Sequence, residues 1–104
     1  MKTKLYVAGP MTGYPEYNRP AFNEAAKFWE EQGYEVVNPA VPDPTLDDSD
    51  WKGYMRRAVY QLLTCNIVAL LPGWEDSKGA KLEVEIATTM EMPIYFPEGW
   101  YDKI

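Results

Sequence analysis

Residues 66–72, with the sequence Asn-Ile-Val-Ala-Leu-Leu-Pro, decide the fold of this chain. The five positions between Asn and Pro are all apolar, which predicts a strand buried on both faces, as in the middle of a parallel sheet. Three shorter apolar segments predict further strands at residues 4–8, 34–37 and 93–96. Helical periodicity separates these strands, over residues 18–32, 50–63 and 79–91.

The alternation of strands and helices predicts an α/β fold over residues 1–104 as one domain. We expect a three-layer, flavodoxin-like or Rossmann-like parallel sheet of four or five strands, with the first strand central and helices on both faces. Ligands bind such sheets beyond the carboxyl ends of the strands. The topology therefore brings three loops to one edge, at residues 9–18, 39–49 and 72–78.

The composition favours a globular domain and disfavours nucleic-acid-binding and membrane-spanning proteins. The 104 residues are 46% hydrophobic and 14% aromatic, enough to fill one core. A formal net charge of −6 disfavours binding to polymeric nucleic acid, which needs a basic face. No apolar run reaches the roughly 20 residues of a membrane span, and no signal peptide is visible, so we expect no membrane partner. A single cysteine, Cys65, fits a reducing cytoplasm.

The chain contains no histidine, which excludes Ser-His and Cys-His nucleophile pairs and histidine-based metal sites. Asp47, Asp48 and Asp50 form the one acidic run that suggests Mg²⁺. A solvated loop that caps the next helix is the simpler interpretation of that run. We expect no metal and no cofactor, and any chemistry would fall to carboxylates, tyrosines, hydroxyls and backbone amides.

Glu83 departs from the helical pattern around it. It shares a helix face with apolar residues, namely Ala80, Ile86, Ala87 and Met90, whereas Glu85 points away. One interpretation is an edge glutamate that reaches for solvent or favours the amino end of the helix. The other is a functional carboxylate, because this helix follows the central strand and begins at the ligand edge.

Two further residues lie near the same edge. Asp76 precedes the helix of Glu83, and Tyr6 lies near the end of the first strand. Taken alone, Asp76 is more often a turn or capping residue and Tyr6 a core residue. Trp74 would either stack on a planar ligand or cover its loop.

Two long blocks of the chain resemble a known family. They are LYVAGPMTGYPEYNRPAFNEAAKFWEEQGYEVVNPA at residues 5–40 and ALLPGWEDSKGAKLEVEIA at residues 69–87. Both resemble the nucleoside 2-deoxyribosyltransferase-like superfamily, and more narrowly a small uncharacterised branch carried by phages and prophages. The resemblance extends from residue 4 to about residue 96.

The resemblance implies roles for single residues. Relatives carry a Glu-x-Gly-x-Ala motif whose glutamate attacks a deoxynucleoside; here EVEIA supplies Glu83 as the nucleophile, with Glu85 in place of the glycine. Asp76 corresponds to the residue that protonates or orients the base, and Tyr6 to the tyrosine that bonds the nucleophile. Relatives often carry aspartates at the positions of Ala58 and Asn66, which are the departures from the pattern.

The implied function is N-glycosyl transfer or hydrolysis of 2′-deoxynucleosides or their 5′-monophosphates through a covalent glutamyl intermediate. The substrate-binding residues expected from the two blocks are Gly9, Pro10, Met11, Tyr14, Asn18, Trp74, Ser77, Lys78 and Gly79. Arg19 would assist Lys78 in holding a 5′-phosphate.

Two alternatives remain open at this point. One is a catalytically silent phage protein that binds or sequesters nucleotides, and the other is a small oligomeric scaffold without a ligand. We expect a homo-oligomer in the cytoplasm of a bacterial host, because relatives complete their sites with a neighbouring subunit. We expect four aromatic residues to be exposed and to suit such an interface: Tyr54, Tyr60, Trp100 and Tyr101.

Overall fold

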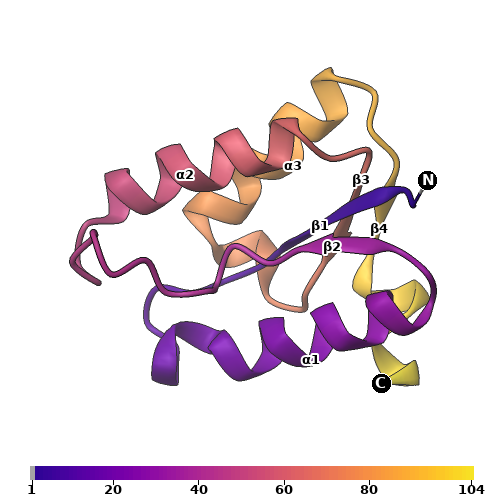
Figure 1. Cartoon of the computed structure of the whole chain (residues 1–104), viewed down its shortest axis with the longest axis horizontal. Coiled ribbons are helices and arrows are strands. Elements are labelled where there is room, and N and C mark those ends of the chain that lie inside the picture. Colours follow the sequence, from indigo (N-terminus) through magenta and orange to yellow (C-terminus); the bar gives the residue numbers. More distant parts are fainter. Residues whose placement is uncertain (1) are drawn as a thin grey trace.

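The computed structural model describes residues 2–104. The chain alternates strands and helices: β1 (Lys4–Ala8), α1 (Arg19–Glu31), β2 (Glu35–Val37), α2 (Trp51–Leu63), β3 (Ile67–Leu70), α3 (Lys78–Thr89) and β4 (Ile94–Tyr95) (Figure 1). The four strands pair in parallel in the order β2-β1-β3-β4. This confirms the predicted α/β class, with the first strand inside the sheet.

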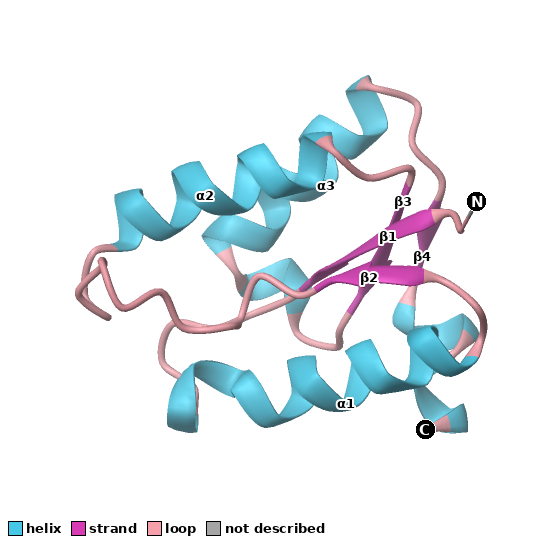
Figure 2. Ribbon diagram, in the orientation of Figure 1, coloured by secondary structure: helices cyan, strands magenta, loops and turns pink. Residues whose placement is uncertain are grey.

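Side chains of the central strands alternate between two helical layers. Leu5 and Val7 of β1 belong to a core cluster with α1, whereas Tyr6 and Ala8 belong to a cluster with α2 and α3. In Figures 1 and 2 the α1 helix accordingly lies below the sheet, and α2 and α3 lie above it. The register of β1 therefore directs Tyr6 into the layer that contains α3.

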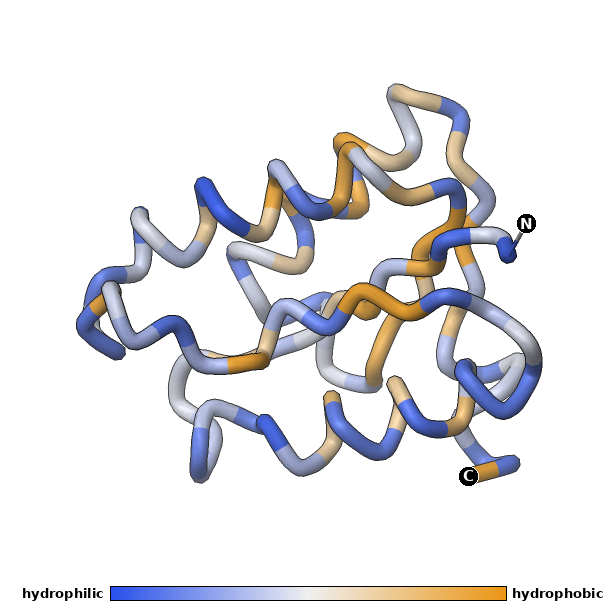
Figure 3. Tube along the Cα trace, viewed as in Figure 1, coloured by the Kyte–Doolittle hydropathy of each residue, from blue (hydrophilic) through white to orange (hydrophobic). Residues whose placement is uncertain are grey.

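Apolar residues are concentrated along the strands, as the hydropathy colouring of Figure 3 shows. Within the part of the chain that the structure describes, no helix combines the length and apolar character needed to cross a bilayer.

The expected exposure of four aromatic residues is largely wrong. Trp100 is only 3% exposed, since the carboxyl-terminal 3₁₀ turns at Pro97–Gly99 and Tyr101–Lys103 fold it against α1. Its ring stacks on Phe28 at a centroid distance of 5.8 Å. Tyr54 and Tyr101 are half-buried, and only Tyr60 is fully exposed.

Two helices begin at side-chain caps and one does not. Asp50 Oδ1 accepts from the Gly53 amide at 3.0 Å at the start of α2, and Ser77 Oγ accepts from the Ala80 amide at 3.2 Å at the start of α3. Asn18, of a residue type favoured at helix caps, stands at the cap position of α1 but its side chain makes no such bond. Asn18 has a left-handed backbone with a φ of 60°, and its amide instead donates to the Pro10 carbonyl at 2.9 Å.

Candidate active site

A cavity of about 340 Å³ opens beyond the carboxyl ends of the strands. All three loops predicted for this edge contribute to its wall, through Gly9, Met11, Thr12, Tyr17, Pro39, Asp48, Ser49 and Ser77. The rest of the wall comes from β1 and the three helices, through Tyr6, Arg19, Phe22, Trp51, Tyr54, Met55, Ala58, Gly79, Ala80 and Glu83. The topological rule therefore located the cavity, although it could not name most of its residues.

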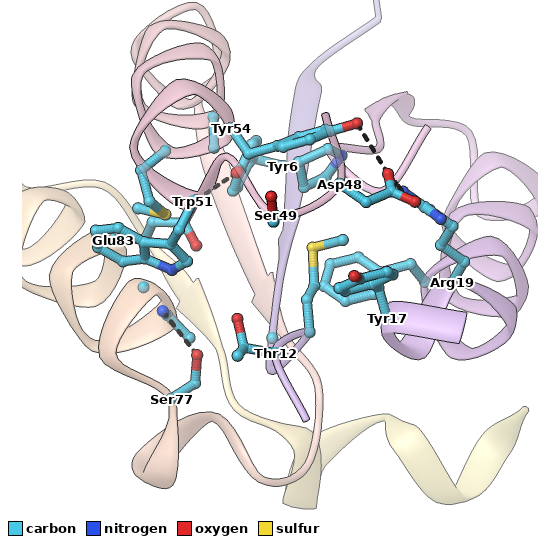
Figure 4. A pocket seen from close by; sticks show the side chains of 18 residues that line it. Tyr6, Thr12, Tyr17, Arg19, Asp48, Ser49, Trp51, Tyr54, Ser77 and Glu83 are labelled. Carbon is cyan, nitrogen blue, oxygen red and sulfur yellow. Dashed lines mark hydrogen bonds and ion pairs between the residues drawn. The ribbon is translucent and has the colours of Figure 1, made fainter. Parts of the chain in front are cut away.

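Glu83 lies in the wall of this cavity and is only 5% exposed. The Tyr6 hydroxyl, which comes from β1, donates a short hydrogen bond to its Oε2 (Figure 4). Burial raises the pKa of Glu83 to about 7, and the hydrogen bond from Tyr6 partly opposes this rise. Burial, together with the neighbouring carboxylate, raises the pKa of Tyr6 well above its ordinary value, so the hydroxyl keeps its proton.

The first turns of α3 hold Glu83 in place. Ser77 caps the helix, and Gly79 lies so close to α2 that an added Cβ would stand 2.9 Å from the sulfur of Met55. Ala80 is buried against the same cavity wall. Small residues one turn before Glu83 therefore let α3 approach α2, and this approach buries the carboxylate.

The far wall of the cavity carries a polar cluster that the sequence patterns did not identify. Asp48 Oδ1 accepts from Arg19 Nη2 at 3.2 Å and from the Tyr54 hydroxyl at 3.4 Å. Arg19 also donates from Nε to the Ala40 carbonyl at 3.1 Å, and its guanidinium lies 5.2 Å from the Tyr17 ring centroid. In the view of Figure 4 this cluster stands on the side opposite Glu83.

The contacts of this cluster differ from what the sequence suggested for Asp48 and for Arg19. Asp48 was interpreted as part of a solvated acidic run, and only the position of its loop at the ligand edge could have indicated another role. Arg19 was expected to assist a phosphate, but its guanidinium is engaged by Asp48 and the Ala40 carbonyl.

Asp76 lies in a neighbouring hollow rather than in the cavity of Glu83. This second hollow, of about 390 Å³, shares Thr12, Trp51, Ser77 and Gly79 with the first and adds Pro10, Tyr14, Gly73, Asp76 and Lys78. Lys78 Nζ lies 4.7 Å from the Trp51 ring centroid at the boundary between the two. The role expected for Asp76 stays a prediction, and its position favours contact with a ligand that extends beyond the first cavity.

Of the other predicted ligand residues, some line one of the two hollows and others line neither. Gly9 and Met11 line the cavity of Glu83, whereas Tyr14 and Lys78 line the second hollow. Asn18 lines neither hollow, because its side chain ties the loop to Pro10. Trp74 also lines neither; it packs against Phe96 at a centroid distance of 6.0 Å and covers its loop.

The two departures from the family pattern have different structural consequences. Ala58 lines the cavity as a buried methyl group and offers no hydrogen bond there. Asn66 lies at the opposite end of the strands, where its Oδ1 accepts from the Lys4 amide at 3.1 Å and its amide donates to the Lys4 carbonyl at 2.9 Å. Asn66 therefore links the start of β1 to the start of β3 by hydrogen bonds and does not line the cavity.

Residues 3–96 match a family model described as "Domain of unknown function (DUF4406)". The chain belongs to this family. Among curated protein sequences, none matches this DUF4406 chain significantly.

Among solved structures, the DUF4406 chain is similar to a 2-desoxiribosyltransferase from Leishmania mexicana, with a TM-score of 0.67 and 13% sequence identity. The match covers 90% of this chain but 63% of the Leishmania chain, so the DUF4406 chain spans less than two thirds of that enzyme. At this identity the similarity shows a shared fold and nothing more specific.

Proposed function

We propose that this protein is an N-glycosyl transferase or hydrolase that acts on 2′-deoxynucleosides or their 5′-monophosphates through a covalent bond to Glu83. The observation that carries the proposal is the carboxylate of Glu83, buried in the wall of a nucleoside-sized cavity and oriented by Tyr6. The fold shared with a deoxyribosyltransferase supports the choice of reaction.

In the first step a Glu83 oxygen attacks C1′ of the deoxyribose. Tyr6 occupies Oε2, which leaves Oε1 to react. A C1′–O ester bond forms while the C1′–N bond breaks, and the bonding electron pair leaves with the base nitrogen. The departing base takes up one proton from a solvent water molecule and leaves as a neutral molecule.

In the second step water or another base attacks C1′ and the ester bond to Glu83 breaks. The attacking group loses one proton to solvent, and Glu83 returns as a carboxylate. Water gives hydrolysis, and a second base gives transfer. The Tyr6 hydroxyl stabilises the carboxylate that leaves, because it donates to it again.

A 5′-monophosphate would lie in the second hollow, beside the sugar. The second hollow adjoins the cavity of Glu83, lies at the amino end of α3 and contains the Lys78 side chain. A cation and a helix amino end both favour a phosphate group. Comparison of nucleosides with their monophosphates as substrates tests this placement.

The decisive experiment is product analysis with purified protein across the common deoxynucleosides and their monophosphates. We expect release of free base, a Glu83-linked deoxyribose detectable by mass spectrometry, and loss of both in the Glu83→Gln variant. Glu85→Gln is the matched control, since Glu85 lies on the same helix but lines neither hollow. Absence of base release with every substrate would overturn the proposal.

Ala58 and the position of Asp76 support one alternative, a protein that binds nucleotides without turning them over. Neither residue supplies the cavity of Glu83 with a group to protonate a base. Calorimetry separates the two functions: nucleotide binding that Glu83→Gln leaves intact, with no product formed by the wild type, would favour the binding protein.

A further inference from the structure

Two carboxylates line the cavity, and the proposed reaction uses only one of them. Glu83 comes from α3, and Asp48 comes from the loop that precedes α2. The Asp48 side chain is 52% exposed, so it remains accessible to a ligand, whereas Glu83 is enclosed. A substrate whose sugar contacts Glu83 would extend toward either the Asp48 cluster or the second hollow.

The contacts of Asp48 make it an acceptor of hydrogen bonds. The Arg19 guanidinium and the Tyr54 hydroxyl both approach Oδ1, so the cation and the hydroxyl act on one oxygen. Among the described residues, none donates a hydrogen bond to Oδ2. A charged carboxylate has no proton to donate, so Asp48 offers a positioned acceptor to whatever occupies this end of the cavity.

Aromatic side chains indicate which part of a substrate belongs at this end. Tyr17, Trp51 and Tyr54 all line the cavity, and Tyr17 and Tyr54 also contact the Asp48 cluster. Flat aromatic surfaces favour a planar base, because bases stack on such side chains. The second hollow, with Lys78, is better suited to the 5′ end of the sugar.

We propose that Asp48, held by Arg19 and Tyr54 on the wall opposite Glu83, selects bases that present an adjacent ring N–H and amino group. Guanine is the common base with such an edge, and the two oxygens of a carboxylate can accept from both donors at once. Adenine and cytosine place an acceptor beside their amino group, which a carboxylate repels. This inference rests on the proposed function, since it names the substrate class of the same site.

The test compares deoxyguanosine with deoxyinosine, which lacks only the 2-amino group. For the wild type we expect kcat/KM for deoxyguanosine to exceed that for deoxyinosine about 10- to 100-fold, the usual effect of one hydrogen bond to a charged group. In the Asp48→Asn variant we expect this ratio to fall to about 3 or less, because the neutral amide accepts less strongly. The same comparison applies to the two monophosphates.

Asp43→Asn is the matched control. Asp43 belongs to the same loop and accepts from the Thr45 amide at 2.9 Å, but it lies outside the cavity wall. Its replacement should leave the deoxyguanosine to deoxyinosine ratio at the wild-type value. Asp48→Ala provides a second variant, and both Asp48 variants should melt close to the wild type, since an exposed ion pair contributes little stability.

Two outcomes would overturn the inference without touching the proposed function. The first is turnover of both nucleosides with a ratio that Asp48→Asn leaves unchanged. The second is a variant whose defect disappears with 2′,3′-dideoxyguanosine, which would place Asp48 against the sugar hydroxyl rather than the base. Absence of turnover with every nucleoside and nucleotide would instead remove the proposed function, and the inference with it.

Discussion

Glu83 is buried in surroundings that disfavour its charged form. Its carboxyl group lies in a wall made largely of apolar side chains, and burial raises its pKa to about 7. The hydrogen bond from Tyr6 favours the charged form. A carboxylate with few partners is costly for the fold but more reactive toward an electrophilic carbon.

The raised pKa predicts that Glu83 destabilises the folded protein above neutral pH. The unfolded value is near 4.5, so between pH 4.5 and about 7 the folded state holds a proton that the unfolded state has lost. Stability from this group therefore falls as pH rises through that window. We expect Glu83→Gln to raise the free energy of unfolding by about 1–3 kcal/mol at pH 8 and to change it little at pH 4.5.

Urea denaturation at the two pH values measures this effect. Glu85→Gln again serves as the control, because Glu85 lies on the same helix and is not buried. A Glu83→Gln variant that is less stable than the wild type at pH 8 would contradict the assignment of a strained carboxylate.

Tyr6 should act on the rate through Glu83. Tyr6→Phe keeps the ring in the core but removes the hydroxyl that donates to Oε2. Loss of that bond raises the pKa of Glu83 further and removes stabilisation of the leaving carboxylate. We expect kcat/KM near pH 7 to fall about 10- to 100-fold, and the rising limb of its pH profile to move to higher pH.

A pH profile of kcat/KM for both proteins checks the role of Tyr6. Because Tyr6→Phe keeps the ring and removes only the hydroxyl, an unshifted limb would contradict the role of that hydroxyl in setting the pKa of Glu83.

At the scale of single residues, a candidate site residue could be predicted from the sequence where it broke a regular pattern. Glu83 interrupts an apolar helix face, and the spacing of helix residues separates it from Glu85. Asp48 breaks no pattern, because an aspartate in a polar loop is ordinary. Its place in the wall depends on contacts with Arg19 and Tyr54, which are distant in sequence, so no local signal could reveal it.

At the scale of elements, the loop after β1 is set by close packing. Gly9 follows the strand directly, and a Cβ at this position would stand 2.7 Å from the Cβ of Leu71. Further along, Glu16, Tyr17 and Asn18 all adopt left-handed backbone conformations before α1 begins. The glycine was predicted as a ligand contact, but its packing against β3 also requires it.

Gly9→Ala should therefore destabilise the fold. The added methyl group meets a Cβ atom, which cannot move without its backbone, so we expect a loss of about 1–3 kcal/mol in the free energy of unfolding. Gly99→Ala is the control, since nothing lies within 4 Å of a Cβ built there. Chemical denaturation of the two variants compares them directly, and equal stabilities would refute the packing argument.

The starts of two helices were predicted to within one residue, and at both of them a side chain caps the helix. Asp50 and Ser77 both do so, and α2 and α3 begin directly after them. Asn18 has a residue type favoured at caps, but three successive left-handed residues turn its side chain toward Pro10. The conformation of that loop depends on contacts within it, such as the bond from Asn18 to Pro10, and the preferences of single residues do not predict these contacts.

At the scale of the whole molecule, the parallel sheet accounts for the meeting of Tyr6 and Glu83. They lie 77 positions apart, yet β1 pairs with β3, and α3 follows β3 on the face to which Tyr6 points. This much follows from strand order and alternation. The division of the edge into two hollows does not, because the residues that line both of them, Thr12, Trp51, Ser77 and Gly79, come from three separate segments of the chain.

The last prediction concerns association between copies of the chain, which we propose from the surface of α2. Tyr60 and Leu63 lie one turn apart on this helix and are 72% and 55% exposed. Large apolar side chains that cluster on a surface are typical of protein interfaces. We expect sedimentation equilibrium at micromolar concentration to give a multiple of 12.0 kDa, and Tyr60→Glu to return the monomer mass, because it places a charge in the contact. Lys27→Glu, at an exposed position on α1 across the sheet from α2 (Figure 1), should leave the mass unchanged, and a wild-type protein that sediments at 12.0 kDa would remove the proposal.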